Sequence, residues 1–133
     1  MLINFDHRKL RVFITDGFWR KTIAAVRALG KIGIEVSVGE STYLSPAFFS
    51  KFTSNRVRTP SPVLNKEKYI EFLLDYLKRN HHDVLIPMED ETQTLISKNR
   101  SLFSQYTNFI LADHECLVCI QDKWNVMKRA RSL

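Results

Sequence analysis

The chain has 133 residues, of which 44% are hydrophobic and 26% charged, and its formal net charge is +6 at pH 7. This length suits one domain with a buried core, and the composition excludes a disordered or low-complexity chain. No apolar run approaches the length of a membrane span and no secretory signal opens the chain, so we expect a cytoplasmic protein with no membrane partner, whose two cysteines stay reduced.

The positive charge is concentrated at the end of the chain. Lys123, Lys128, Arg129 and Arg131 fall within the last eleven residues, which contain no acidic residue. The other basic residues form scattered pairs, not one basic helix with interleaved aromatics, which would indicate nucleic-acid recognition. Nucleic-acid binding through this basic tail therefore ranks below a metabolite or protein partner.

The first half of the chain predicts a βαβ unit followed by an edge strand. Residues 10–15 form an apolar strand, a helix follows with apolar residues at spacing three, and residues 34–38 form a second strand. Residues 46–52 predict a short helix capped by Ser45, with three phenylalanines facing the core. Residues 56–59 predict a short, charged edge strand.

The second half predicts helices around one more buried strand. Residues 66–78 form the clearest helix, with apolar residues at i, i+3, i+4, i+7 and i+8 after Asn65 as cap. Residues 84–86 predict a buried strand, and a helix follows from residue 90 to residue 103. A fifth strand is predicted at residues 109–112, and Asp113 and Asp122 predict the caps of two further helices.

Three carboxylates follow the predicted strand at residues 84–86. Pro87 ends the strand because it cannot donate to a ladder, and Glu89, Asp90 and Glu91 come directly after it. Open parallel sheets bind ligands at the carboxyl ends of their central strands, so these residues are candidate ligand contacts. The alternative, with equal weight, is that the acidic residues only stabilise a helix N-terminus, with Asp90 as the cap.

The first strand–helix turn contains a single glycine. The segment at residues 15–20 does not match the G-x-G-x-x-G dinucleotide fingerprint. An anion on the helix N-terminus, beside Arg20 and Lys21, is one interpretation. An ordinary turn, with Phe18 and Trp19 packed into the core, is the favoured one.

The histidines and cysteines give no pattern of a metal or redox site. His81 and His82 are adjacent, so their side chains point apart, and we interpret both as solvated loop residues. Cys116 and Cys119 form a C-x-x-C motif near the chain's end, with no second pair to complete a zinc site. The favoured interpretation is two buried small residues one helical turn apart.

Several segments together resemble the N-terminal, pre-ATP-grasp domain of the ATP-grasp superfamily. They are residues 12–22, 27–30, 36–40 and 85–92, with Asp122-Lys123 opening the last helix. The branch they resemble is the one described as carbamoyl-phosphate-synthase-like or biotin-carboxylase-like. The resemblance implies an α/β, Rossmann-like three-layer fold with a mostly parallel sheet of four to five strands flanked by helices.

The resemblance also implies a function and a set of site residues. Such enzymes activate a carboxylate with ATP as an acyl phosphate and pass the acyl group to an amine. The glutamate-containing turn after the fourth strand would contact substrate through Glu89 and Glu91, and the first turn through Asp16 and Gly17. Lys123 would approach the nucleotide phosphates. ATP and magnesium belong to the full-length protein, and neither is expected to bind this fragment tightly.

The implied organisation is a pre-ATP-grasp domain at residues 1–120 and, at residues 121–133, the start of a helix leading into an absent ATP-grasp domain. The glycine-rich loop, magnesium carboxylates and catalytic arginine of that domain are missing, so we expect no catalytic residue here and a fragment inactive alone. Expected partners are a small carboxylate or amine substrate and the missing domain. A homodimer is an open alternative, as is a stand-alone module that binds a small metabolite or a partner subunit.

Overall fold

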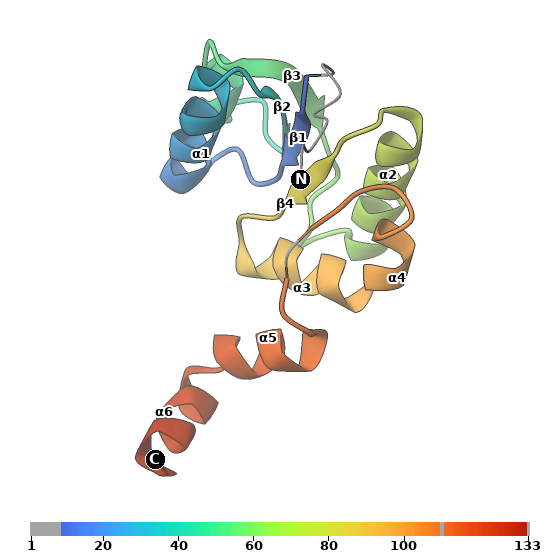
Figure 1. Ribbon diagram of the computed structural model, residues 1–133. Helices are drawn as coiled ribbons and strands as arrows, with labels where there is room; N and C mark the ends of the chain where they lie inside the picture. Colours follow the sequence, from blue (N-terminus) through green and yellow to red (C-terminus); the bar gives the residue numbers. More distant parts are fainter. Residues whose placement is uncertain (1–8, 110, 133) are drawn as a thin grey trace, which may run out of the picture.

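The computed structural model describes residues 9–109 and 111–132, which fold as helices around an open sheet. Four strands form the sheet: β1 (Arg11–Ile14), β2 (Glu35–Glu40), β3 (Thr53–Arg58) and β4 (Val84–Ile86). All pairings are parallel and the strand order is β3-β2-β1-β4 (Figure 1). The predicted α/β, Rossmann-like three-layer fold is confirmed, with four strands.

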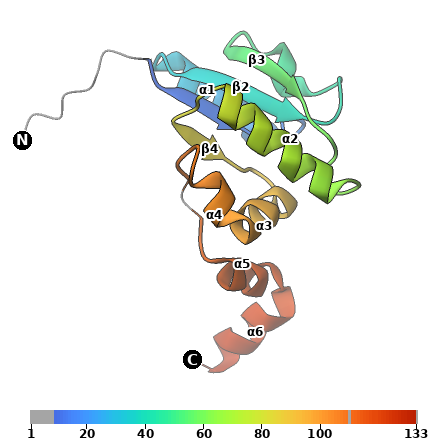
Figure 2. The same ribbon diagram turned by 90° about the vertical axis from the view of Figure 1, so that its right-hand side faces the viewer.

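Helices cover both faces of the sheet (Figure 2). One face carries α1 (Arg20–Lys31) and the 3₁₀ helix η1 (Pro46–Phe49); the other carries α2 (Lys66–Arg79), α3 (Asp90–Lys98) and α4 (Arg100–Phe103). Neighbouring residues of a strand point to opposite faces, so Val12 and Ile14 pack toward α1 whereas Phe13 packs toward α2. Two apolar cores therefore hold the sheet between its helices.

Helix α2 follows its sequence pattern. Tyr69, Leu73 and Leu77 lie four residues apart, and each is at most 2% exposed. Asn65 precedes the helix and basic residues occupy its last turn, as predicted. This helix stabilises the sheet because it buries a continuous apolar stripe.

Two further helices follow the α/β layers. Helix α5 (His114–Gln121) packs against α3, and α6 (Lys123–Ser132) packs mainly against α5 and extends away from the sheet (Figure 1). Asp113 and Asp122 immediately precede them as predicted, and the Trp124 backbone N–H donates to Asp122 Oδ1 at 3.0 Å. None of the helices within the described ranges combines the length and the apolar character needed to cross a membrane.

The predicted fifth strand does not form among the described residues of 109–112; Ile110 lies outside them. Asn108 makes one isolated parallel bridge to Val84, and the ladder goes no further. The reason is that the Arg100 guanidinium occupies the carbonyls of Leu111 and Ala112, at 2.5 and 2.8 Å. Strand β4 is thus the last strand of the sheet, not a central one.

Burial departs from prediction at His82 and at the cysteines. His82 is fully buried, with Nδ1 2.8 Å from the Asn80 carbonyl and Nε2 2.9 Å from Ser37 Oγ. Its neighbour His81 is exposed. The two side chains therefore point apart as predicted, but only the ring of His81 is solvated. Cys116 is exposed and Cys119 half-buried, because α5 packs on the body through Leu117.

One of the three phenylalanines predicted to face the core does not do so. Phe48 is buried and Phe52 half-buried, whereas Phe49 is 75% exposed. The tighter turn of a 3₁₀ helix brings residues three apart into line, so η1 cannot turn Phe48 and its neighbour Phe49 to the same side. Only part of this apolar cluster therefore contributes to the core.

The buried imidazole of His82 makes stability depend on pH. Burial, as the largest cause, holds the pKa of His82 below its ordinary value of 6.5. The unfolded chain then binds a proton that the folded chain does not, so the free energy of unfolding should fall as pH drops below 6.5. Denaturant titrations from about pH 8 to about pH 5 should show this slope, and His82→Gln should flatten it. Equal slopes in both proteins would contradict the assignment.

Candidate functional site

The candidate site lies where the strand order reverses. Strand β1 pairs with β2 on one side and with β4 on the other. The chain leaves β1 toward α1 on one face and leaves β4 toward α3 on the opposite face (Figure 1). Loops that diverge in this way open a crevice at the carboxyl edge, which is the usual ligand position in open α/β sheets.

The Asp16 carboxylate joins the two diverging loops. Its Oδ2 accepts hydrogen bonds from the backbone N–H groups of Met88 and Glu89, at 3.2 and 3.0 Å. It also accepts from the hydroxyls of Thr92, at 2.7 Å, and Thr15, at 2.5 Å. Asp16 has φ of 61°, a left-handed conformation that aspartate tolerates better than most residues. One oxygen of this predicted substrate contact is thus engaged within the protein.

Burial raises the pKa of Asp16 above its ordinary value of 3.8, and the four hydrogen bonds oppose that rise. The hydrogen bonds favour the ionised form because each donor points at a carboxylate oxygen. Asp16 therefore contributes to the site by fixing its shape.

Gly17 lies in tight contact with β2 and η1. Its N–H donates to the Gly39 carbonyl at 3.3 Å, and its carbonyl accepts from the Ala47 N–H at 3.1 Å. A Cβ at this position would lie 2.5 Å from Ser45 Oγ and 2.7 Å from Val38 Cγ1. Close packing against Ser45 and Val38 is thus enough to explain why this turn needs glycine, whether or not a ligand contacts it.

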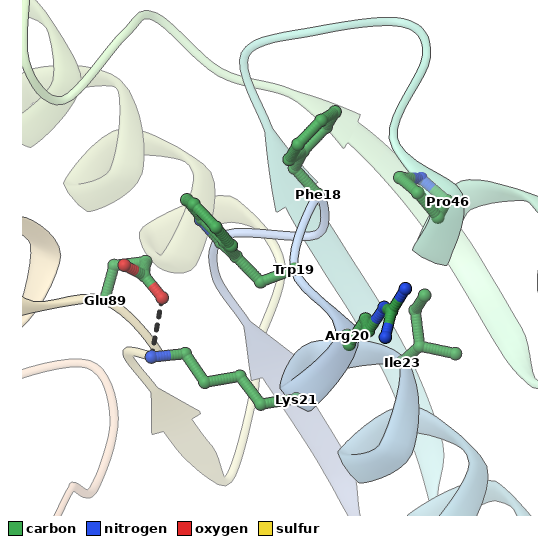
Figure 3. A pocket seen from close by; sticks show the side chains of 7 residues that line it. All are labelled: Phe18, Trp19, Arg20, Lys21, Ile23, Pro46 and Glu89. Atoms are coloured by element: carbon green, nitrogen blue, oxygen red, sulfur yellow. Dashed lines mark ion pairs between the residues drawn. The ribbon is translucent and has the colours of Figure 1, made fainter.

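Glu89 and Glu91 flank the start of α3 and pair with lysines from opposite faces. Glu89 Oε1 lies 2.6 Å from Lys21 Nζ of α1 (Figure 3), and Glu91 Oε1 lies 2.8 Å from Lys66 Nζ of α2. Glu89 is the N-cap residue, with its N–H donating to Thr92 Oγ1 at 3.3 Å. The cap predicted at Asp90 was therefore misplaced by one residue, and Asp90 opens the helix.

A pocket of about 470 Å³ opens at this edge, and its charged lining is entirely acidic. The carboxylates that line it are Asp16, Glu40, Glu89, Asp90 and Glu91. Backbone donors hold Glu40 in place: Oε2 accepts from the Phe18 N–H at 3.0 Å and Oε1 from the Ser41 N–H at 2.6 Å. Within the described ranges, the Asp90 carboxylate has no hydrogen bond or ion pair. We name this hollow the acidic pocket.

A second pocket of about 890 Å³ lies beside the first, on the α1 side (Figure 3). Phe18 and Trp19 line both pockets, and their rings meet edge to face with centroids 5.9 Å apart. They are 51% and 49% exposed, so the prediction that they pack into the core was wrong. The reason is that Asp16 and Gly17 hold the turn against the sheet edge, which directs the next two side chains outward. We name this hollow the α1 pocket.

Lys123 is the first residue of α6, and its side chain lies outside the described part of the structure. The helix nevertheless begins close to the site. Gln121 Nε2 donates to the Asp90 carbonyl at 3.2 Å, and Thr94 Oγ1 donates to Gln121 Oε1 at 2.9 Å. The backbone at Lys123 thus follows a segment that is anchored to the start of α3.

The chemistry of these walls favours a cation. Carboxylates repel a triphosphate, so the acidic pocket does not fit ATP. Within residues 9–109 and 111–132, no three histidine, cysteine or acidic side chains gather in a way that could hold a metal ion. An ammonium group fits this lining, because it donates several hydrogen bonds to carboxylates and also interacts with aromatic faces.

No protein-family model matches this chain, and no curated protein matches it either. The fold and the site are therefore the basis for assigning a function. The sequence predicted a site at the sheet edge where the acidic pocket lies, but its pattern did not single out Glu40 or the exposure of Phe18 and Trp19. A signal for Glu40 was present, because it ends the strand next to β1 in a parallel sheet.

Proposed function

We propose that this chain is the substrate-binding N-terminal domain of an ATP-dependent carboxylate–amine ligase of the ATP-grasp type, and that the acidic pocket receives the ammonium group of the amine substrate. The observation that carries the proposal is the set of five carboxylates at the switch point, and none of the described residues that line the same pocket is a lysine or an arginine. Primary amines are protonated near neutral pH, so charge-assisted hydrogen bonds would hold them there.

The carboxylates have different roles in this proposal. Asp90 and Glu40 would contact the ammonium group directly, since neither has a lysine or arginine partner among the described residues. Glu89 and Glu91 would add negative potential and contact substrate through the oxygens that their lysines leave available. Phe18 and Trp19 would cover the bound cation with aromatic surface.

ATP and magnesium would bind outside the acidic pocket. In the reaction class proposed, ATP converts a substrate carboxylate into an acyl phosphate, which the bound amine then attacks. The described walls of the pocket suit the amine and repel phosphate, so a further ATP-grasp domain must supply the nucleotide site. Lys123 is the residue of this chain that we propose to face the nucleotide. The proposed compartment is the cytoplasm.

Binding of ε-aminocaproamide, which carries one ammonium group and an uncharged amide, tests the ammonium site. Trp19 lies in the pocket wall, so Trp124→Phe protein should report binding through fluorescence. Asp90→Asn or Glu40→Gln should each weaken binding about tenfold, because each removes a charge-assisted hydrogen bond. Glu67→Gln is the matched control, because Glu67 is an exposed residue of α2 that lies outside this pocket. Absence of saturable binding, or an equal effect of all three changes, would refute the ammonium site.

Glu89→Gln addresses the ligase reaction itself, in the complete enzyme. We expect the substitution to raise the KM for the amine substrate more than the KM for ATP, because Glu89 borders the acidic pocket. Lys68→Gln, which changes an exposed charge on α2, is the control and should leave both values unchanged. Steady-state kinetics with each substrate varied in turn give the answer, and unchanged kinetics for both would contradict the role of Glu89.

A second candidate is a binding module without catalysis. Helices α5 and α6 expose a run of apolar side chains, Val118, Ile120, Trp124, Val126 and Met127, which favours a protein partner on that surface. Amine-dependent release of phosphate from ATP by the complete protein would support the enzyme, and amine binding without any turnover would support the module. A steep salt dependence of RNA or DNA affinity would instead assign α6 to nucleic acid.

A further inference from the structure

The two pockets of the candidate site carry opposite charge preferences. The acidic pocket is lined by five carboxylates, whereas the α1 pocket is lined by two cations, Arg20 and Lys21, and by one carboxylate, Glu89. They share Phe18, Trp19 and Glu89 as lining residues, so they adjoin along this aromatic pair. A ligand that reaches across the pair would meet carboxylates at one end and cations at the other.

Arg20 is the cation available to such a ligand. Lys21 is engaged with Glu89 at 2.6 Å, and Figure 3 shows its chain extending toward that carboxylate. The Arg20 guanidinium lies instead on the side of Ile23 and Pro46, away from the Lys21–Glu89 pair (Figure 3). Arg20 makes no ion pair with any residue of the described ranges. A guanidinium in this position suits a carboxylate, which it can bind through two parallel hydrogen bonds.

The surface between the charged ends is apolar. Phe18 and Trp19 are about half exposed, and Ile23 and Pro46 complete the wall of the α1 pocket near Arg20. Burying methylene groups against this wall removes apolar surface from water, which is favourable. A short aliphatic chain therefore gains binding energy where a polar linker would not.

We propose that the ligand of this site is a zwitterion with an apolar spacer, an ω-amino acid or a compound of that class, whose ammonium lies in the acidic pocket and whose carboxylate binds Arg20. This inference rests on the proposed function and names the class of its amine substrate. A simple α-amino acid carries both charges on one carbon and cannot place them on opposite sides of the aromatic pair. A simple alkylamine would leave Arg20 without a partner, and a simple carboxylate would meet Glu89.

Three probes with the same aliphatic spacer separate the contributions of the two charged ends. ε-Aminocaproic acid carries both charges, ε-aminocaproamide keeps only the ammonium, and the N-acetyl derivative of the acid keeps only the carboxylate. Their affinities are measured by Trp19 fluorescence in Trp124→Phe protein. The acid should bind about tenfold more tightly than the amide, which corresponds to one charge-assisted pair. The N-acetyl derivative should bind most weakly, since acetylation removes the ammonium group that the acidic pocket would hold.

Arg20→Gln tests whether the carboxylate of the ligand binds Arg20. The variant should bind the acid only as tightly as the amide, and its affinity for the amide should equal that of the parent protein. Arg27→Gln, an exposed change on the same helix but outside both pockets, is the control and should retain the tenfold preference. Equal affinity of the parent for acid and amide, or an equal loss for both ligands in Arg20→Gln, would overturn the zwitterion proposal.

The same measurements keep the two proposals apart. If the amide binds and depends on Asp90 while the acid binds no better, the zwitterion proposal fails and the ammonium site stands. If neither the amide nor the acid binds, both the proposed function and the zwitterion proposal fail. Preference for the acid that disappears in Arg20→Gln supports both.

Discussion

Asp16→Ala is expected to lower the free energy of unfolding by about 3 kcal/mol. The carboxylate accepts two backbone N–H groups and two hydroxyls across the switch point, so its removal leaves partly buried donors without an acceptor. Alanine must also adopt the φ of 61° that aspartate holds here, and because alanine tolerates this left-handed conformation less well than aspartate, the difference in strain adds to the loss. Denaturant unfolding of parent and variant measures the sum.

Asp16→Gly separates the two causes. Glycine loses the same hydrogen bonds but adopts the left-handed conformation without strain, so it should be more stable than Asp16→Ala by about 1 kcal/mol. Asp16→Asn keeps one acceptor oxygen and should rank above both, because asparagine also tolerates this φ. If alanine and glycine variants had the same stability as the parent protein, the Asp16 network would not hold the loops together.

Gly17→Ala is expected to destabilise the chain by about 2 kcal/mol, in the range typical of overpacked cores. The new Cβ would lie 2.5 Å from Ser45 Oγ and 2.7 Å from Val38 Cγ1, and both neighbours are fully buried. Val38 belongs to the core beneath α1, so it cannot move aside without disturbing that packing. The resemblance implied that Gly17 contacts substrate. If that were its only role, Gly17→Ala would lower the affinity for substrate and leave the free energy of unfolding unchanged.

Val38→Ala provides the partner variant for a double-mutant cycle. Alone it should destabilise the core by about 1–3 kcal/mol through lost burial. Combined with Gly17→Ala it removes one of the two atoms that the new Cβ would meet, Val38 Cγ1, so the double variant should be less destabilised than the sum of the single effects. Strict additivity of the two changes would contradict a steric conflict between the new Cβ and Val38.

Features of the fold that depend on local pattern could be predicted from the sequence. The apolar stripe of α2 and the acidic residues before α5 and α6 locate those helices, because periodicity and capping act over a few residues. The proline after β4 likewise marks the end of that strand and hence the edge where the acidic pocket lies. The parallel sheet follows from the order of these elements.

Features that depend on distant partners could not be predicted. The Asp16 network joins residues more than seventy positions apart, and no local pattern shows which carboxylate will occupy the crevice. Phe18 and Trp19 are exposed because of the turn that precedes them, whereas their apolar character alone favours the core. His82, in the loop before β4, is buried where Ser37 of β2 pairs with its ring. Residues 109–112 form an apolar run typical of a buried strand, but Arg100 donates to the carbonyls of Leu111 and Ala112.

The measurement that tests the central claim most directly is a map of ε-aminocaproamide binding by proton–nitrogen correlation spectra of the complete chain. We predict saturable shifts at the backbone amides of Phe18, Ser41 and Glu91, which line the acidic pocket from three different segments of the chain. The same shifts should be absent in a Glu40→Gln, Asp90→Asn double variant that remains folded. Shifts confined to α6, or no saturable shifts at all, would contradict an ammonium site at the carboxyl edge of the sheet.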